Sequence, residues 1–210
     1  MALQLKPIVP KTIAFNIIGT SPLIQHAWSP KGLRQMRMTP AERKKQPKEV
    51  RDPEKEANSA MYRTSDGAPG FPMLSFKASL IGAAHKDLGI EKTVVRKALF
   101  LPSHAYGDGL IAPLIFDGEP EIREDIVRVG SGATDLRYRP MFHQWGVRVI
   151  VQIDHEILNE QDVVNLVNRA GFSVGVGEWR PEKGGEYGRF EFDVKSGVTV
   201  LAHDTLQKAA

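Results

Sequence analysis

Alternating apolar and polar residues predict β-strands in several parts of the chain. The pattern is clearest from Trp145 to Asp154, where every second side chain is apolar. Because side chains two positions apart lie on the same face of a strand, such a segment buries one face and leaves the other polar. Strands are predicted in this way at residues 12–18, 110–116, 121–129, 145–154 and 189–194.

Helical spacing of apolar residues occurs in two longer segments, 75–88 and 159–170. In each segment apolar side chains recur three or four positions apart, which places them on one face of a helix. Ser75 and Asn159 are residue types that cap helix starts, and a glycine directly follows each segment. We therefore expect two amphipathic helices, whereas the short segment 94–101 fits either a helix or a strand.

The order of these elements predicts an α+β fold. It is the βαββαβ order of ferredoxin-like or RRM-type domains, in which two helices cover one face of an antiparallel sheet. We expect residues 1–210 to form a single RRM-like domain with two insertions. A basic insertion is predicted at about 25–70 and a thumb-like hairpin insertion at about 117–143, with residues 130–140 as a loop or hairpin tip.

Length and composition are those of a folded domain, with 210 residues, 41% hydrophobic and 25% charged. The net charge is only +3, so any affinity for a polyanion must come from where the cations lie. The chain has no cysteine, which excludes disulfides and thiolate chemistry. Its first residues lack the apolar core of a signal peptide, and no apolar run approaches about 18 residues. We therefore expect a cytoplasmic protein of a bacterial cell, with no membrane partner.

Residues 171–190 contain six glycines and lie between a predicted helix and a predicted strand. Glycine lets a backbone adopt left-handed conformations and come close to another molecule. The segment is neither a dinucleotide-binding fingerprint nor a Walker A motif, because it follows a helix and lacks Gly-Lys-Ser/Thr. Its cations suit a phosphate backbone and its aromatics suit stacked bases, while a long surface hairpin is the alternative. The candidate residues are Trp179, Arg180, Lys183, Tyr187 and Arg189.

Both predicted insertions also combine cations with apolar or aromatic side chains. Such segments contact polyanions or neighbouring subunits, but they are equally typical of a solvated surface. The candidate nucleic-acid contacts in the first insertion are Lys31, Arg34 and Arg37. Those in the second are Arg137, Tyr138 and Arg139.

The six histidines do not form a metal-binding pattern. The sequence has no HExxH pair, no paired carboxylates suited to Mg²⁺ and no GxSxG motif. We therefore predict no metal site, no cofactor and no catalytic residue. The alternative is a metal-independent endoribonuclease in which His26, just after the first strand, acts as acid or base on a ribose 2′-hydroxyl.

Three segments resemble the RAMP superfamily, the repeat-associated RRM-like subunits of CRISPR effectors. Residues 70–88, GFPMLSFKASLIGAAHKDL, resemble the segment that opens the first helix of that family. Residues 171–192 resemble its glycine-rich loop and last strand, and residues 17–28, IIGTSPLIQHAW, its first strand and exit. The resemblance implies that one groove holds phosphates between Ser75, Lys77, Arg180, Lys183, Tyr187 and Arg189.

Within the superfamily the chain is most similar to the backbone subunits, which polymerise along guide RNA. It departs from the family at Phe76, where a small residue is usual, and its loop looks like that of stand-alone phage members. We therefore expect a non-catalytic single-stranded nucleic-acid-binding protein that self-associates into a helix or ring along the strand. Phage-type coating of single-stranded DNA in replication or recombination is the main interpretation. The alternatives are a CRISPR-type guide-RNA-binding backbone subunit, the endoribonuclease, and a phage structural or assembly protein.

Overall fold

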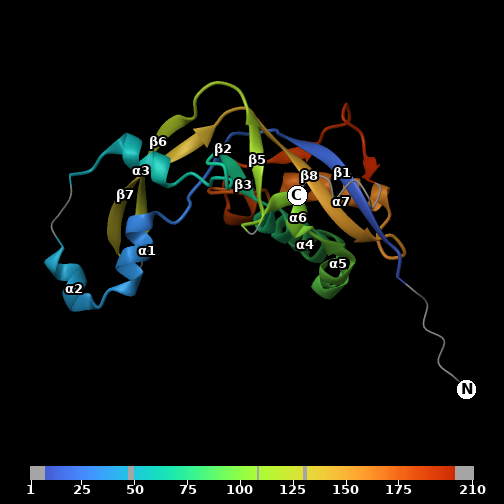
Figure 1. The fold of residues 1–210 in the computed structure, drawn as a ribbon, viewed down its shortest axis with the longest axis horizontal. Helices are drawn as coiled ribbons and strands as arrows, with labels where there is room; N and C mark the ends of the chain where they lie inside the picture. The colour runs from blue at the N-terminus through green and yellow to red at the C-terminus, as the bar shows by residue number, and fades with distance from the viewer. Residues whose placement is uncertain (1–7, 47–49, 108, 130–131, 202–210) are drawn as a thin grey trace, which may run out of the picture.

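The computed structural model describes residues 8–46, 50–107, 109–129 and 132–201, and it shows an α+β fold built on antiparallel sheets (Figure 1). The main sheet is ordered β10-β1-β8-β5-β3, with β9 also paired to β1 and β4 to β8. Its strands are β1 (Pro10–Gly19), β3 (Gly70–Pro72), β4 (Leu99–Phe100), β5 (Ile111–Phe116), β8 (Trp145–Asp154), β9 (Phe190–Phe192) and β10 (Thr199–Leu201). Strands β3, β4 and β10 extend the sheet beyond the strands that alternation predicts.

One face of the main sheet carries the hydrophobic core. Phe15 of β1 lies opposite Val149 of β8, and both are buried. Helices α4 (Met73–Leu88) and α7 (Glu160–Ser173) contact each other and pack against this face. Burying each large apolar side chain in such a core stabilises the fold by about 1.5–3 kcal/mol. This packing fixes the start of α4 and the end of α7, the two elements that frame the candidate site.

Two of the four predicted helix ends are confirmed. Asn159 caps α7, because its side chain accepts the N–H of Asp162 while the Asp162 carboxylate accepts the Asn159 N–H. Gly89 ends α4 in the left-handed conformation, with a φ of 68°.

The other two predicted helix ends are wrong. Helix α4 begins at Met73, so Ser75 lies in its first turn, and no side chain caps the helix. Gly171 lies inside α7 rather than after it, because the helix crosses very close to the last core strand there. A Cβ at this position would lie 1.7 Å from the carbonyl oxygen of Phe190.

Both predicted insertions contribute to a lobe that stands apart from the main sheet and contains a second, three-stranded sheet. It consists of β2 (Leu23–Ile24), β7 (Ala133–Phe142) and β6 (Glu121–Val129), with α3 (Pro53–Ser59) packed on β7. Arg51 Nη2 donates to Asp135 Oδ1 over 2.6 Å, which links the first insertion to the hairpin. The predicted loop at 130–140 is therefore wrong for residues 133–140, which belong to strand β7, while residues 130 and 131 lie outside the described ranges.

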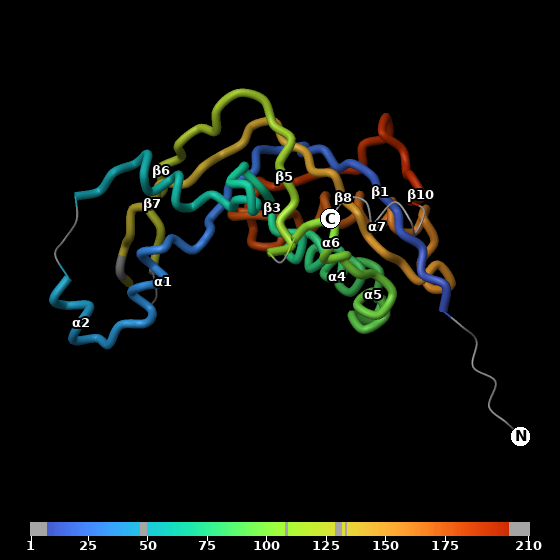
Figure 2. The backbone as a smooth tube through the Cα atoms, viewed as in Figure 1, coloured from blue at the N-terminus to red at the C-terminus, as the bar shows by residue number. Residues whose placement is uncertain are grey.

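The lobe and the main sheet are the two arms of an arch (Figure 2). Helices α1 (Pro30–Arg37) and α2 (Pro40–Lys45) extend from the lobe without a single buried residue. On the other arm, α5 (Lys92–Ala98) and α6 (Ser103–Tyr106) flank strand β4. The ambiguous segment 94–101 therefore contains both the end of a helix and a short strand.

Tyr106 completes the hydrogen bonding of β8 at a residue between the two short strands that pair with it, β4 and β5. Strand β4 pairs with β8 at Ile153 and β5 pairs with it at Val147, which leaves Ile150 between them. The Tyr106 hydroxyl donates to the Ile150 carbonyl over 2.8 Å and accepts the Ile150 N–H. Burial raises the pKa of Tyr106 far above its ordinary value, so the hydroxyl remains a donor at neutral pH.

Candidate nucleic-acid interface

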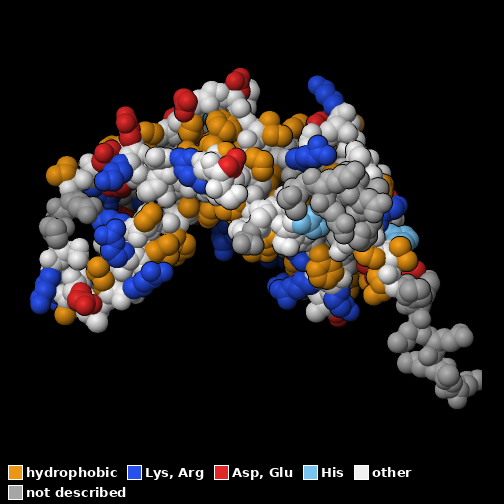
Figure 3. Space-filling view, viewed as in Figure 1, with side chains coloured by type: hydrophobic (Ala, Val, Ile, Leu, Met, Phe, Trp, Pro, Cys, Tyr) orange, Lys and Arg blue, Asp and Glu red, His pale blue; other side chains and the backbone are white. Residues whose placement is uncertain are grey.

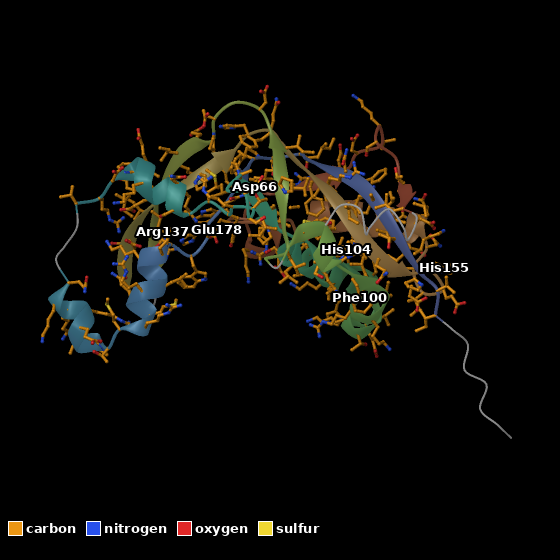
Figure 4. The ribbon with its side chains drawn as sticks, in the orientation of Figure 1. Asp66, Phe100, His104, Arg137, His155 and Glu178 are labelled. Atoms are coloured by element: carbon orange, nitrogen blue, oxygen red, sulfur yellow. The ribbon has the colours of Figure 1, made fainter. Side chains whose placement is uncertain are left out.

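A groove of about 300 Å³ lies between the start of α4 and the glycine-rich loop, residues 174–188. It lies where the two arms of the arch meet. Figure 4 shows Glu178, one of its lining residues, between the lobe and the main sheet. The polar side chains that line it are Gln25, His26, Tyr62, Ser75, Ser79, Glu178, Arg180 and Glu182.

The α4 wall of the groove presents hydrogen-bond donors. No side chain caps α4, although the Met73 N–H in its first turn donates to the Leu110 carbonyl over 2.8 Å. Ser75 is exposed there, and Ser79 is only 3% exposed. Among the described residues the Ser79 hydroxyl has no hydrogen-bond partner. A helix start with such donors favours an anion.

The glycine-rich loop is a wall fixed against its own chain. Gly177 and Gly188 have φ values of 76° and 66°, and a Cβ on either would meet a backbone oxygen, at 2.6 and 1.7 Å respectively. The Glu178 N–H donates to the Ile24 carbonyl over 3.0 Å, and the Gly188 N–H donates to the Pro22 carbonyl over 2.8 Å. These two glycines therefore serve close packing within the protein, where the sequence predicted a close approach to another molecule.

Arg180 lines the groove as part of a group of three charges. Its Nε and Nη2 donate to Glu182 Oε2 over 3.1 and 2.9 Å, and Lys86 Nζ donates to Glu182 Oε1 over 2.8 Å. The Lys86 hydrogen bond is the main reason that the pKa of Glu182 is lowered, with Arg180 adding to it. This group of two cations and one carboxylate carries one net positive charge, and the other carboxylate that lines the groove, Glu178, is paired with Arg139.

Arg139 lies inside the protein, with 1% of its side chain exposed. Its Nη2 donates to Asp125 Oδ2 over 2.6 Å and its Nη1 to Glu178 Oε2 over 3.1 Å. Burial favours the neutral form of Asp125, but hydrogen bonds from Arg123 and Arg139 outweigh it and lower the pKa of that carboxyl. Arg139 therefore joins the hairpin to the glycine-rich loop and is buried away from the surface.

Two other predicted residues, Tyr187 and Arg137, belong to the same junction between the hairpin and the glycine-rich loop. Arg123 Nη1 donates to the Tyr187 hydroxyl over 2.8 Å, and the guanidinium lies 4.8 Å from the Tyr187 ring centroid. Arg137 lies 3.5 Å from His26 Nδ1 and 3.5 Å from Asp135 Oδ2. Figure 4 shows Arg137 and Glu178 near one another where the hairpin meets the loop. On the same strand, Tyr138 lies opposite Glu124 of β6.

The family resemblance implied that Ser75 and Lys77 face the same groove, but they do not. Ser75 lines the groove together with Ala78 and Ser79. Lys77 lies on the other flank of α4, where its Nζ is 4.8 Å from the centroid of the Phe100 ring. Side chains two positions apart in an α-helix point in directions that differ by more than half a turn, which accounts for the separation of Ser75 and Lys77.

The remaining predicted residues lie outside the groove. Arg189 stacks over Phe172 at 5.0 Å and lines a second pocket on the other side of the loop. Trp179 is 44% exposed with a φ of 52°, and Lys183 is exposed in the short turn Pro181–Lys183. In the lobe, α1 carries the exposed cations Lys31, Arg34 and Arg37. A nucleic-acid contact by any of these residues stays a prediction.

Sequence reasoning missed the acidic half of the junction and one of its cations, namely Asp125, Glu178 and Arg123. A signal was present, because Arg123 and Asp125 are two positions apart and share a face of a strand. Pairing the hairpin in register would have placed Arg123 directly opposite Arg139. Two such cations side by side require a carboxylate between them.

His26 lies in the groove, 3.9 Å from Glu178. Burial lowers its pKa, and this outweighs the opposing effect of Glu178. A neutral imidazole of this kind is able to accept a proton. Within the described ranges no group of three His, Asp or Glu side chains is placed to hold a metal ion. None of the helices in those ranges has the length and apolar character that crossing a membrane requires.

The fold and the groove together define a class of protein: an α+β domain with an antiparallel sheet, two packed helices and a fixed glycine-rich loop beside a helix start. No protein-family model and no curated protein sequence matches the chain. Solved structures do match the chain. A chain of the cryo-EM structure of the Type III-B Cmr-beta bound to cognate target RNA matches with a TM-score of 0.50 and 10% identity. The match covers 96% of this chain and 62% of that one.

The crystal structure of Cmr6 from Pyrococcus furiosus is a second neighbour, with a TM-score of 0.44 and 13% identity. That match covers 89% of this chain and 100% of Cmr6. The neighbour with a TM-score of 0.50 shares the fold of this chain, which agrees at the level of the fold with the resemblance predicted from three short segments. The first neighbour is considerably longer, since this chain spans less than two thirds of it.

Proposed function

We propose that this chain is a non-catalytic subunit that holds single-stranded RNA within a multi-subunit assembly. The observation that carries the proposal is the groove, which joins a helix start without a side-chain cap, Arg180 and the Ser79 hydroxyl, which has no hydrogen-bond partner within the described ranges. A phosphate there would accept hydrogen bonds from the start of α4 and lie beside the net positive charge of Arg180, Lys86 and Glu182.

The distribution of charge supports the same location. Lys and Arg side chains lie along the concave side of the arch on both arms (Figure 3). A single strand that follows this side would pass from the lobe to the main sheet through the groove. Cations along its path would supply affinity without sequence specificity.

We assign the core to a ferredoxin-like βαββαβ unit made of β1, α4, β5, β8, α7 and β9. The sheet neighbours β9-β1-β8-β5 support this assignment, as do α4 and α7 on the core face. On this assignment residues 1–210 form one RRM-like domain. The insertions leave it after β1 and after β5 and combine into the lobe.

RNA, and not DNA, is the strand that the comparisons favour. The neighbour with a TM-score of 0.50 is described as bound to cognate target RNA. None of the comparisons supports phage-type coating of single-stranded DNA, so the proposal moves to the guide-RNA alternative. Assembly with other subunits rests on the same neighbour, and self-association along the strand stays a prediction.

Fluorescence anisotropy with matched RNA and DNA tests the proposal. A short labelled single-stranded RNA should bind more tightly than the same sequence as single-stranded DNA or as duplex, in the presence of EDTA. The logarithm of its affinity should fall with the logarithm of salt concentration, by about 0.7 for each phosphate neutralised. Equal affinity for RNA and DNA would contradict the choice of RNA.

Arg180→Ala tests the position of the strand. Loss of one charged hydrogen bond to a phosphate should weaken RNA binding about tenfold and flatten the salt dependence. Lys195→Ala is the matched control, since Lys195 is an exposed cation in the turn before β10, and it should bind as the wild type does. An unchanged affinity and salt dependence for Arg180→Ala would remove the groove from the account.

A further inference from the structure

Phe100 is an exposed aromatic ring with cations beside it. It ends the short strand β4 and is 50% exposed. Lys77 of α4 places its ammonium 4.8 Å from the ring centroid, and Arg96 of α5 is close enough to repel that ammonium. Figure 4 shows Phe100 beside α5 on the main-sheet arm of the arch.

No carboxylate of the described residues forms an ion pair with the partly buried Lys77 or with the exposed Arg96. Arg123, Arg139 and Arg180 each contact at least one carboxylate. Burial lowers the pKa of Lys77, and the charge of Arg96 lowers it further. Keeping an unpaired, partly desolvated cation costs free energy, and a bound anion would offset that cost.

The position of Phe100 relative to the groove is set by α4. Ser75 lines the groove on one flank of the helix, and Lys77 reaches Phe100 on the other. The first turn lies between them with Leu74 59% exposed. A helix with its side chains is only about 10–12 Å across, so a strand leaving the groove over this turn reaches Phe100 within a few nucleotides.

We propose that Phe100 is a stacking platform for one base of the bound strand, with Lys77 and Arg96 holding the adjoining phosphate. The inference rests on the proposed function and adds to it a second contact point with its own chemistry. One face of the ring carries the Lys77 ammonium, and the exposed part receives the base. Because every base has a π-face, the platform accepts any nucleotide.

An abasic scan of the RNA tests the platform directly. A short single-stranded RNA is prepared with one abasic nucleotide at each position in turn and titrated against the wild type and Phe100→Ala. Phe100→Ala should weaken binding of the intact RNA about five- to hundredfold. One abasic position should weaken binding to the wild type by a similar factor and leave binding to Phe100→Ala unchanged.

Two further variants separate stacking from packing. Phe100→Trp keeps an aromatic face and should restore binding and the abasic profile. Ile157→Ala removes an apolar side chain of similar exposure, 45%, in the turn after β8 and should have no effect.

The outcomes separate the platform from the proposed function. If Arg180→Ala weakens binding while Phe100→Ala matches the wild type at every abasic position, the platform is overturned and the groove stands. If Phe100→Ala weakens binding equally for all abasic RNAs, the ring positions other residues and the stacking proposal fails. If the wild type binds no single-stranded RNA, both proposals fail together.

Discussion

At the scale of single residues, Arg139 shows how the two arms of the arch are joined. It donates to Asp125 in the hairpin and to Glu178 in the glycine-rich loop, and it is almost fully buried. The two carboxylates each accept one hydrogen bond from the guanidinium, while Nε has no hydrogen-bond partner among the described residues. The fixed position of the loop, and hence the shape of the groove, depends on this contact.

Arg139→Ala should therefore destabilise the fold strongly. Removing one partner of a buried ion pair leaves an uncompensated charge, which costs roughly 3–5 kcal/mol. Arg137→Ala is the matched control, because Arg137 is 31% exposed and such pairs contribute about 0–1 kcal/mol. Urea unfolding followed by circular dichroism measures both. Equal losses of unfolding free energy for the two variants would contradict the assigned role of Arg139.

His26 should make stability depend on pH. Burial lowers its pKa in the folded state below the ordinary value near 6.5, so the unfolded chain binds the proton more tightly. The stability that the neutral His26 contributes to the fold is therefore complete above pH 6.5 and is lost as the pH falls below that value. His26→Gln should reduce the difference in urea midpoint between pH 8 and pH 5.5. The exposed His104→Gln should leave the difference in place, and an unchanged difference in His26→Gln would contradict the assignment.

At the scale of elements, two glycines in helices have opposite reasons for being there. Gly171 of α7 touches the backbone of Phe190, where a Cβ would lie 1.7 Å from an oxygen. Gly82 of α4 has only the Val174 methyl groups nearby, at 3.6 and 3.7 Å, which is ordinary contact. The first glycine lets a helix and a strand approach closely, while the second weakens a helix without a steric need.

Substituting alanine at each of these positions should change stability in opposite directions. Gly82→Ala should raise the free energy of unfolding by about 0.5–1 kcal/mol, because alanine costs less backbone entropy in a helix. Gly171→Ala should lower it by about 1–3 kcal/mol or more, since backbone must move to admit the methyl group. Thermal or urea unfolding distinguishes the two. A stabilised Gly171→Ala would show that the helix and strand are not in contact there.

Much of the main sheet was predictable because its periodicity is local. Alternation located β1, β5 and β8, and helical spacing located α4 and α7. The end of α7 was missed because glycine is the residue type that ends helices. Gly171 instead packs against Phe190 of strand β9, far along the chain from any local signal. Strand β7 was missed because polar residues such as Arg139 contact carboxylates of strand β6 and of the glycine-rich loop and not an apolar core.

The candidate site was less predictable because its geometry depends on contacts between distant segments. Ser75 and Arg180 do line one groove, while a contact of either residue with nucleic acid stays a prediction. Lys77 was placed there too, although two positions along a helix reverse a side chain's direction. Phe100 gave no signal, because a single aromatic residue in an ambiguous segment is as typical of a core as of a surface.

At the scale of the whole molecule, both insertions serve one purpose. Placed after β1 and after β5, they meet in the lobe and produce an arch with the groove between its arms (Figure 2). Cations line the concave side on both arms (Figure 3). On the proposed function, such an arrangement would surround a single strand on several sides and provide affinity that tolerates any sequence.

Photo-crosslinking of 4-thiouridine RNA, with mass spectrometry of the crosslinked peptides, tests the central claim most directly. The account predicts crosslinks in the segments that line the groove, 25–26, 62, 72–79 and 174–182, and beside Phe100. The same crosslinks should weaken in Arg180→Ala. Crosslinks confined to strand β10 and the turn before it, or none at all with RNA in excess, would contradict the account.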